Sequence, residues 1–151
     1  MSALAKVEEE GEERKHDHQW RIPPALLEEL RKGLMKKQDA IRSSRDFEAL
    51  MAITEQVASK IWKNAELTIY DTTHRLAVYR GIEPEHVYLH AGTREGAREL
   101  GLPGNKKFLR LQDMPMPLQR LKPYELENLF CTSRKAFRKL RLKGGSNSHT
   151  R

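Results

Sequence analysis

The sequence predicts an all-α fold: an irregular or orthogonal bundle of five to six helices with disordered charged tails. Apolar residues recur at helical spacing in several segments, most regularly over residues 46–63. Proline and glycine fall where these segments begin and end, as they do at helix termini. The chain of 151 residues has the usual length of one domain. We therefore expect a helical domain over residues 22–143, between tails at 1–21 and 144–151.

The first two helices are expected to pack as an antiparallel pair. One begins at the prolines after Ile22 and continues to Ile41, although Gly33 weakens it by about 1 kcal/mol relative to alanine. Ser43 and Asp46 have the spacing of a capping box, which predicts a stop and a restart. The second helix carries a longer apolar stripe, made of Phe47, Leu50, Met51, Thr54, Val57, Ala58 and Ile61. A pair of helices leaves one side of such a stripe exposed, so a third element must cover it.

Residues 66–80 carry signals for both a helix and strands. Threonine, valine and tyrosine in this segment suit strands. Gly81 followed by Ile82, however, is typical of a glycine that ends a helix. We therefore favour a helix, whose buried face would hold Ile69, Thr72, Leu76 and Tyr79.

Two shorter helical pieces are expected next. Pro84 would start one over residues 85–91, and Thr93 would cap another that ends at Leu100 before a glycine stop at Gly101. Residues 102–122 contain several prolines and read as an ordered loop, with an extended piece near 107–111.

The last predicted helix begins at Pro123 and continues to residue 143. Its buried stripe would be Leu126, Leu129, Phe130, Phe137 and Leu140. Its basic residues lie toward the C-terminal end, where the helix dipole favours them, and Gly144 would end it.

Charge is distributed unevenly along the chain, which has a net charge of +7. Residues 1–20 are acidic, with a net charge of −3, and the remainder carries +10. No acidic residue follows Glu127, so nothing near in sequence neutralises the basic residues of the last helix. A block of one sign points to a polyanionic partner or, more simply, to a solvated and solubilising tail.

We favour a non-enzymatic protein that binds DNA or RNA. The phosphate contacts would come from the basic C-terminal helix, through Arg134, Lys135, Arg138, Lys139, Arg141 and Lys143. One alternative is a helical adaptor or regulatory protein whose last helix docks on a protein partner. A further alternative is a small metal-dependent enzyme built around two histidines, His86 and His90.

These histidines are four residues apart, so a helix would place both rings on one face, as in some zinc sites. The zinc motif with this spacing has glutamate after its first histidine, and Val87 stands there instead. The sequence does not indicate a complete set of four zinc ligands, so we expect no bound metal and no cofactor. A second candidate is an anion site at Thr93, Arg94 and Arg98, where a helix start would present backbone N–H groups. A tight helix corner explains the same residues.

The single cysteine excludes an internal disulfide and fits a reducing compartment. Cys131 has no histidine close to it in sequence, so we expect a small buried apolar side chain. The first residues lack the pattern of a secretory signal, and no apolar run is long enough to span a bilayer. We expect a cytoplasmic protein that does not enter membranes.

Overall fold

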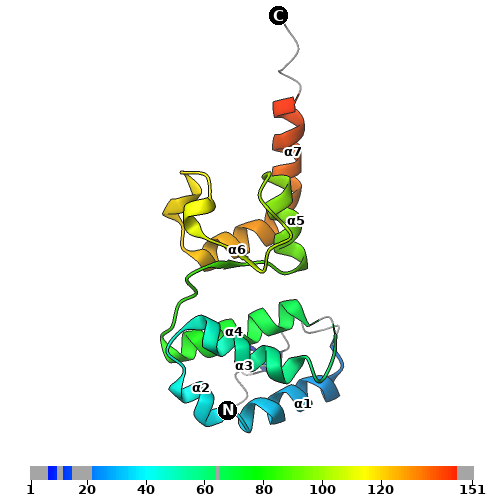
Figure 1. Cartoon of the computed structure of the whole chain (residues 1–151). Helices are drawn as coiled ribbons and strands as arrows, with labels where there is room; N and C mark the ends of the chain where they lie inside the picture. Colours follow the sequence, from blue (N-terminus) through cyan, green and yellow to red (C-terminus); the bar gives the residue numbers. More distant parts are fainter. Residues whose placement is uncertain (1–6, 10–11, 15–21, 64, 146–151) are drawn as a thin grey trace, which may run out of the picture. The chain divides into compact units, whose positions relative to one another are not determined.

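The computed structural model describes residues 7–9, 12–14, 22–63 and 65–145, with side chains over 22–63 and 65–141. The described chain is mostly helical, which confirms the all-α prediction (Figure 1). The sequence predicts one domain over 22–143. Contacts divide the chain into two compact units, Met1–Pro84 (unit 1) and Glu85–Arg151 (unit 2). Each unit has its own core and is described by itself.

Unit 1 begins with a short ribbon in the segment predicted to be disordered. Strand β1 (Val7–Glu9) pairs antiparallel with β2 (Glu12–Arg14), and Val7 lies opposite Arg14. The sequence predicts a disordered tail over 1–21, and within it the structure describes these two strands of three residues each. The rest of that segment lies outside the described residues, as do residues 146–151 of the predicted C-terminal tail.

The first predicted helix is two helices, α1 (Pro24–Met35) and α2 (Gln38–Ser43). The Lys37 N–H donates to the carbonyl of Leu34 at 2.9 Å, one residue nearer than in an α-helix. This tighter bond ends α1, so the single helix predicted up to Ile41 is wrong. Leu27, Leu30 and Leu34 of α1 are buried as expected.

Helix α3 (Phe47–Ala58) confirms the most regular prediction, because the expected stripe from Phe47 to Ala58 is buried. The Asp46 carboxylate accepts the Ala49 N–H at 2.8 Å and so caps the helix directly. The predicted box led by Ser43 is wrong, because that hydroxyl donates backward to the Ala40 carbonyl. Helix α3 packs against α1 on one side and α4 on another, which supplies the covering element that the sequence requires.

Helix α4 (Glu66–Arg80) confirms the choice of helix over strand. It ends at Gly81, whose φ of 67° lies in the left-handed region. The Ile82 N–H donates a hydrogen bond to the Ala77 carbonyl at 2.8 Å. Its buried face differs from the prediction, since Tyr79 is 72% exposed. Buried threonines replace large apolar groups on that face, and the Thr73 hydroxyl donates to the Ile69 carbonyl at 2.7 Å.

Unit 2 opens with a strand where the sequence predicts a helix over 85–91. Strand β3 (Val87–Tyr88) pairs antiparallel with β4 (Phe108–Leu109), and Val87 lies opposite Leu109. Valine and tyrosine favour extended chain, and pairing with a distant segment decides in favour of the strand. The extended piece expected near 107–111 is confirmed.

Helix α5 (Ala91–Glu99) starts earlier than predicted, because its N-cap is His90 rather than Thr93. The Thr93 hydroxyl accepts the His90 N–H at 2.7 Å and donates to the His90 carbonyl at 2.9 Å. The predicted end of the helix at Gly101 is confirmed, since Gly101 has a φ of 76° and the Leu102 N–H donates a hydrogen bond to the Ala97 carbonyl.

The predicted last helix is two helices, α6 (Pro123–Thr132) and α7 (Arg134–Gly145), which separate at Ser133. Two 3-10 turns, η2 (Leu111–Asp113) and η3 (Leu118–Arg120), precede them. Helix α5 contacts both α6 and α7. Gly96 permits the close approach of α5 to α6, because a Cβ there would lie 2.1 Å from the Phe130 carbonyl oxygen.

The core of unit 2 joins the ribbon to the helices. Its buried members are Val87, Leu89, Ala97, Leu109, Met114, Leu126 and Phe130. Leu140 was predicted to belong to this core but is 64% exposed, because α7 departs from the line of α6. No helix within the described ranges is both long enough and apolar enough to span a bilayer.

Candidate nucleic-acid interface

Three of the six predicted phosphate-binding residues form ion pairs within unit 2. Arg134 contacts Glu95 at 2.6 Å, Arg138 contacts Glu95 at 3.2 Å and Glu99 at 3.1 Å, and Arg141 contacts Glu99 at 3.6 Å. The two glutamates lie on α5, about one helical turn apart, so they present a row of carboxylates to α7. The expectation that nothing neutralises these arginines is wrong, because the acids come from a distant part of the sequence.

The lysines of α7 differ from its arginines. Lys135 and Lys139 are exposed and make no ion pair among the described side chains. Lys143 lies within α7, but its side chain is outside the described set. The positive charge of α7 that remains for an outside partner is therefore concentrated on lysines.

The residues of the predicted anion site serve contacts inside unit 2. Thr93 is fully buried, and its hydroxyl forms two hydrogen bonds with the backbone of His90. Arg94 donates to the carbonyls of Gly104 at 3.2 Å and Lys106 at 2.8 Å, which ties α5 to the following loop. Arg98 is exposed, and its stem lies against Gly104. These contacts match the tight-corner alternative.

A basic hollow lies beside strand β4 and was not predicted. It has a volume of about 490 Å³ and is lined by Lys106, Lys107, Phe108, Arg110 and Asp113. Its three basic side chains are exposed, and one acid faces them. The sequence carried a signal for it in the run Lys-Lys-Phe-Leu-Arg, in which basic residues stand on both sides of two apolar ones.

The aromatic ring in this hollow is held by its neighbours. Phe108 stacks on the His86 ring, with centroids 4.3 Å apart and planes 12° from parallel. Tyr88 lies across the ribbon from Phe108, with ring centroids 5.8 Å apart. The ribbon therefore presents a supported aromatic ring among basic side chains.

The histidines of the predicted metal pair are not brought together. The chain between His86 and His90 is extended at β3, so the rings do not lie one helical turn apart. His86 stacks on Phe108, whereas His90 is 3% exposed and has a different polar neighbour. The i, i+4 argument fails because it depends on a helix that does not form.

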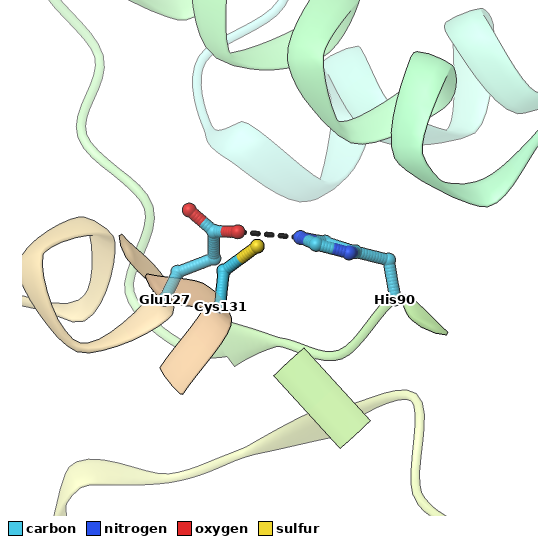
Figure 2. A group of neighbouring side chains, drawn as sticks. All are labelled: His90, Glu127 and Cys131. Carbon is cyan, nitrogen blue, oxygen red and sulfur yellow. Dashed lines mark hydrogen bonds and ion pairs between the residues drawn. The ribbon is translucent and has the colours of Figure 1, made fainter. Parts of the chain in front are cut away.

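His90 instead lies beside two residues of α6. Its Nε2 is 2.5 Å from Oε1 of Glu127, and Cys131 lies next to this pair (Figure 2). One nitrogen, oxygen or sulfur atom from each of the three residues lies within 4.8 Å of the others. The sequence signal for this cluster was the i, i+4 spacing of Glu127 and Cys131, but nothing in the sequence indicates which histidine faces them.

The two units differ in net charge. Residues 85–151 contain 14 Lys and Arg against 6 Asp and Glu, a net charge of +8. Residues 1–84 contain 14 against 15, a net charge of −1. The net positive charge of the chain therefore belongs entirely to unit 2.

No protein family, curated protein or solved structure shows a significant match to the chain.

Proposed function

We propose that the protein binds nucleic acid through unit 2, with the basic hollow beside β4 as its centre. The observation that carries the proposal is the grouping of Lys106, Lys107 and Arg110 around Phe108. Cations that line a hollow attract phosphates, and an aromatic ring among them offers a surface on which a base stacks. The +8 charge of unit 2 adds long-range attraction for a polyanion.

The α7 residues then take two different roles. Lys135 and Lys139 add phosphate contacts, since no described acid pairs with them. Arg134 and Arg138 hold α7 against α5 through Glu95 and contribute less to affinity. Phosphate contacts position the nucleic acid without reading its sequence, so little sequence preference is expected.

The test is fluorescence anisotropy with labelled single-stranded DNA, single-stranded RNA and duplex DNA of mixed sequence, over a salt series. The decisive variant is Lys106→Glu with Lys107→Glu. Loss of about two phosphate contacts reduces the slope of log affinity against log salt by about 1.4 on single strands and 1.8 on duplex DNA. The matched control is Lys36→Glu with Lys37→Glu, an adjacent lysine pair in unit 1 that undergoes the same charge change.

Phe108→Leu tests the stacking step, because it removes the ring and keeps most of the apolar volume. Affinity for single strands falls by about 1–3 kcal/mol if one base stacks there, while the salt slope is unchanged. Absence of binding at low salt contradicts the proposal. So does an equal loss of affinity in the two lysine-pair variants, because that would show a dependence on net charge alone.

The adaptor alternative has one observation in its favour, the exposed Leu140 on α7. An apolar side chain between basic residues suits a helix that docks in a groove. Leu140→Gln, which has nearly the size and shape of Leu140→Glu but no charge, shows whether the apolar side chain itself matters. If Leu140 only faces solvent, the glutamine variant binds nucleic acid like the unmodified protein.

A further inference from the structure

We propose that His90, Glu127 and Cys131 form a binding site for a zinc ion. The three side chains offer an imidazole nitrogen, a carboxylate oxygen and a thiolate sulfur, which are the ligand types that zinc takes in proteins. Their candidate ligand atoms all lie within 4.8 Å of one another (Figure 2). This inference does not depend on nucleic-acid binding, since the cluster shares no residue with the basic hollow.

The elements that carry these side chains hold them in place. Glu127 and Cys131 are four residues apart on α6, so both project from one face of the helix. His90 is the N-cap of α5, and its backbone is fixed on both sides by the Thr93 hydroxyl. Contacts between α5 and α6 then bring the histidine to the glutamate and the cysteine.

The site is sheltered from solvent, which favours a charged ligand held by opposite charge. The His90 side chain is 3% exposed and that of Glu127 is 14% exposed. A bound cation would compensate the charges of the buried carboxylate and of the thiolate together. Burial also limits competition from water for the metal ligands.

The present geometry needs only a small change to accept the ion. Nε2 of His90 and Oε1 of Glu127 are hydrogen-bonded partners 2.5 Å apart. Tetrahedral zinc with bonds of about 2.0–2.1 Å places two such ligand atoms about 3.3 Å apart. The side chains must therefore separate by about 0.8 Å, and metal binding releases the hydrogen-bonded proton.

Gly92 keeps space open beside the sulfur. A Cβ at this position would lie 3.1 Å from Sγ of Cys131 and 3.7 Å from Cε1 of the His90 ring. Three protein ligands leave one position of a tetrahedral zinc ion for water or another small ligand, as in sites that do chemistry. Glycine at residue 92 leaves room for that fourth ligand.

The test uses the full chain, stripped of metal by a chelator and then titrated with Co²⁺, a spectroscopic substitute for zinc. We expect one equivalent to bind, with intense visible bands of tetrahedral cobalt and a sulfur-to-cobalt charge-transfer band in the near ultraviolet, and Zn²⁺ to abolish both. Because Cys131 is the only cysteine, the charge-transfer band reports this site alone. Histidines elsewhere in the chain cannot produce it.

Two variants and one control define the ligands. Cys131→Ser removes the charge-transfer band, and Glu127→Gln weakens cobalt binding at least tenfold, because each removes an anionic ligand. His86→Ala keeps the full spectrum, since His86 stacks on Phe108 outside the cluster. Loss of the spectrum in His86→Ala would move the metal to the pair of histidines predicted from sequence and overturn the proposal.

A second measurement needs no variant and therefore does not depend on how the variants fold. Stoichiometric Zn²⁺ is expected to slow the reaction of Cys131 with a thiol reagent at least tenfold, and chelator restores the rate. An unchanged rate with saturating zinc, or cobalt spectra without the sulfur band, overturns the proposal.

Discussion

The guanidinium of Arg134 donates a 2.6 Å hydrogen bond to the carboxylate of Glu95, which lies 39 residues earlier in the chain. The same side chain donates from Nε to the Cys131 carbonyl at 3.0 Å, at the end of α6. Arg134 thus joins α5, α6 and the start of α7. A residue that looked like a free cation in the sequence is a structural link.

The first prediction concerns the charge that Glu95 removes from α7. Glu95→Gln releases Arg134, while Arg138 keeps its contact with Glu99, so nucleic-acid affinity at low salt rises by about two- to fivefold, the size of one surface charge interaction. The control is Glu29→Gln, an exposed acid of unit 1 with the same charge change. Anisotropy titration is the measurement. An equal gain in both variants would show that the location of the charge does not matter.

The same substitution has a small effect on stability. Arg134 and Glu95 are 42% and 44% exposed, so water screens the pair. We expect the free energy of unfolding to fall by less than about 1 kcal/mol, as for other exposed ion pairs. Urea denaturation followed by far-ultraviolet circular dichroism measures it. A loss well above this value would mean that α7 docks mainly through its arginines.

A second prediction tests why glycine stands inside α1. Gly33→Ala adds helix propensity of about 1 kcal/mol, but the new Cβ would lie 2.4 Å from Cγ1 of Val57 on α3. The cost of overpacking exceeds the gain in helix propensity, so the free energy of unfolding of unit 1 falls by about 1–3 kcal/mol. Both tryptophans of the sequence belong to unit 1, so intrinsic fluorescence in urea follows the unfolding of this unit. In the double variant with Val57→Ala the clash disappears, so the two losses are less than additive by about 1 kcal/mol or more.

A third prediction concerns the buried hydroxyl of Thr93. Thr93→Val keeps the shape but removes both hydrogen bonds with the His90 backbone, at a cost of about 2 kcal/mol. Thr93→Ser keeps the hydroxyl and loses only a methyl group, so it costs less. Circular dichroism in urea compares the two variants. Equal losses would mean that packing of the methyl group, not the cap, holds the start of α5.

A fourth prediction concerns the contact between α5 and α6. Gly96→Ala places a Cβ only 2.1 Å from the Phe130 carbonyl oxygen. This oxygen belongs to the backbone, which cannot move aside as a side chain can. We expect a loss of about 3 kcal/mol or more. Gly92→Ala is the comparison, because its nearest neighbour is the Cys131 sulfur at 3.1 Å. If the two losses match, close backbone approach is not the reason for Gly96.

Much of the fold followed from local patterns. The stripe of α3 marked its buried face, because the sequence repeats apolar groups at the helical period throughout that segment. Gly81 and Gly101 marked helix ends, since both adopt the left-handed conformation that glycine tolerates best. Such features depend on neighbours within a few residues, which a single sequence displays.

The errors have a different origin. Strand β3 forms where a helix was predicted, because its partner β4 is about 20 residues away and pairing outweighs local preference. The interruptions at Lys37 and Ser133 carry no proline or glycine, so no local signal announces them. Tertiary packing sets the direction of the chain at both points.

The candidate sites show the same division. The sequence by itself determined that the protein is helical, that its charge is positive after the acidic start, and that Glu127 and Cys131 lie on a helix that begins at Pro123. Only the tertiary structure decided which acids neutralise the arginines of α7 and which histidine meets Glu127. Charges and metal ligands act over a few ångströms in space, and only folding brings Glu95 to Arg134 or His90 to Glu127 across nearly forty residues of chain.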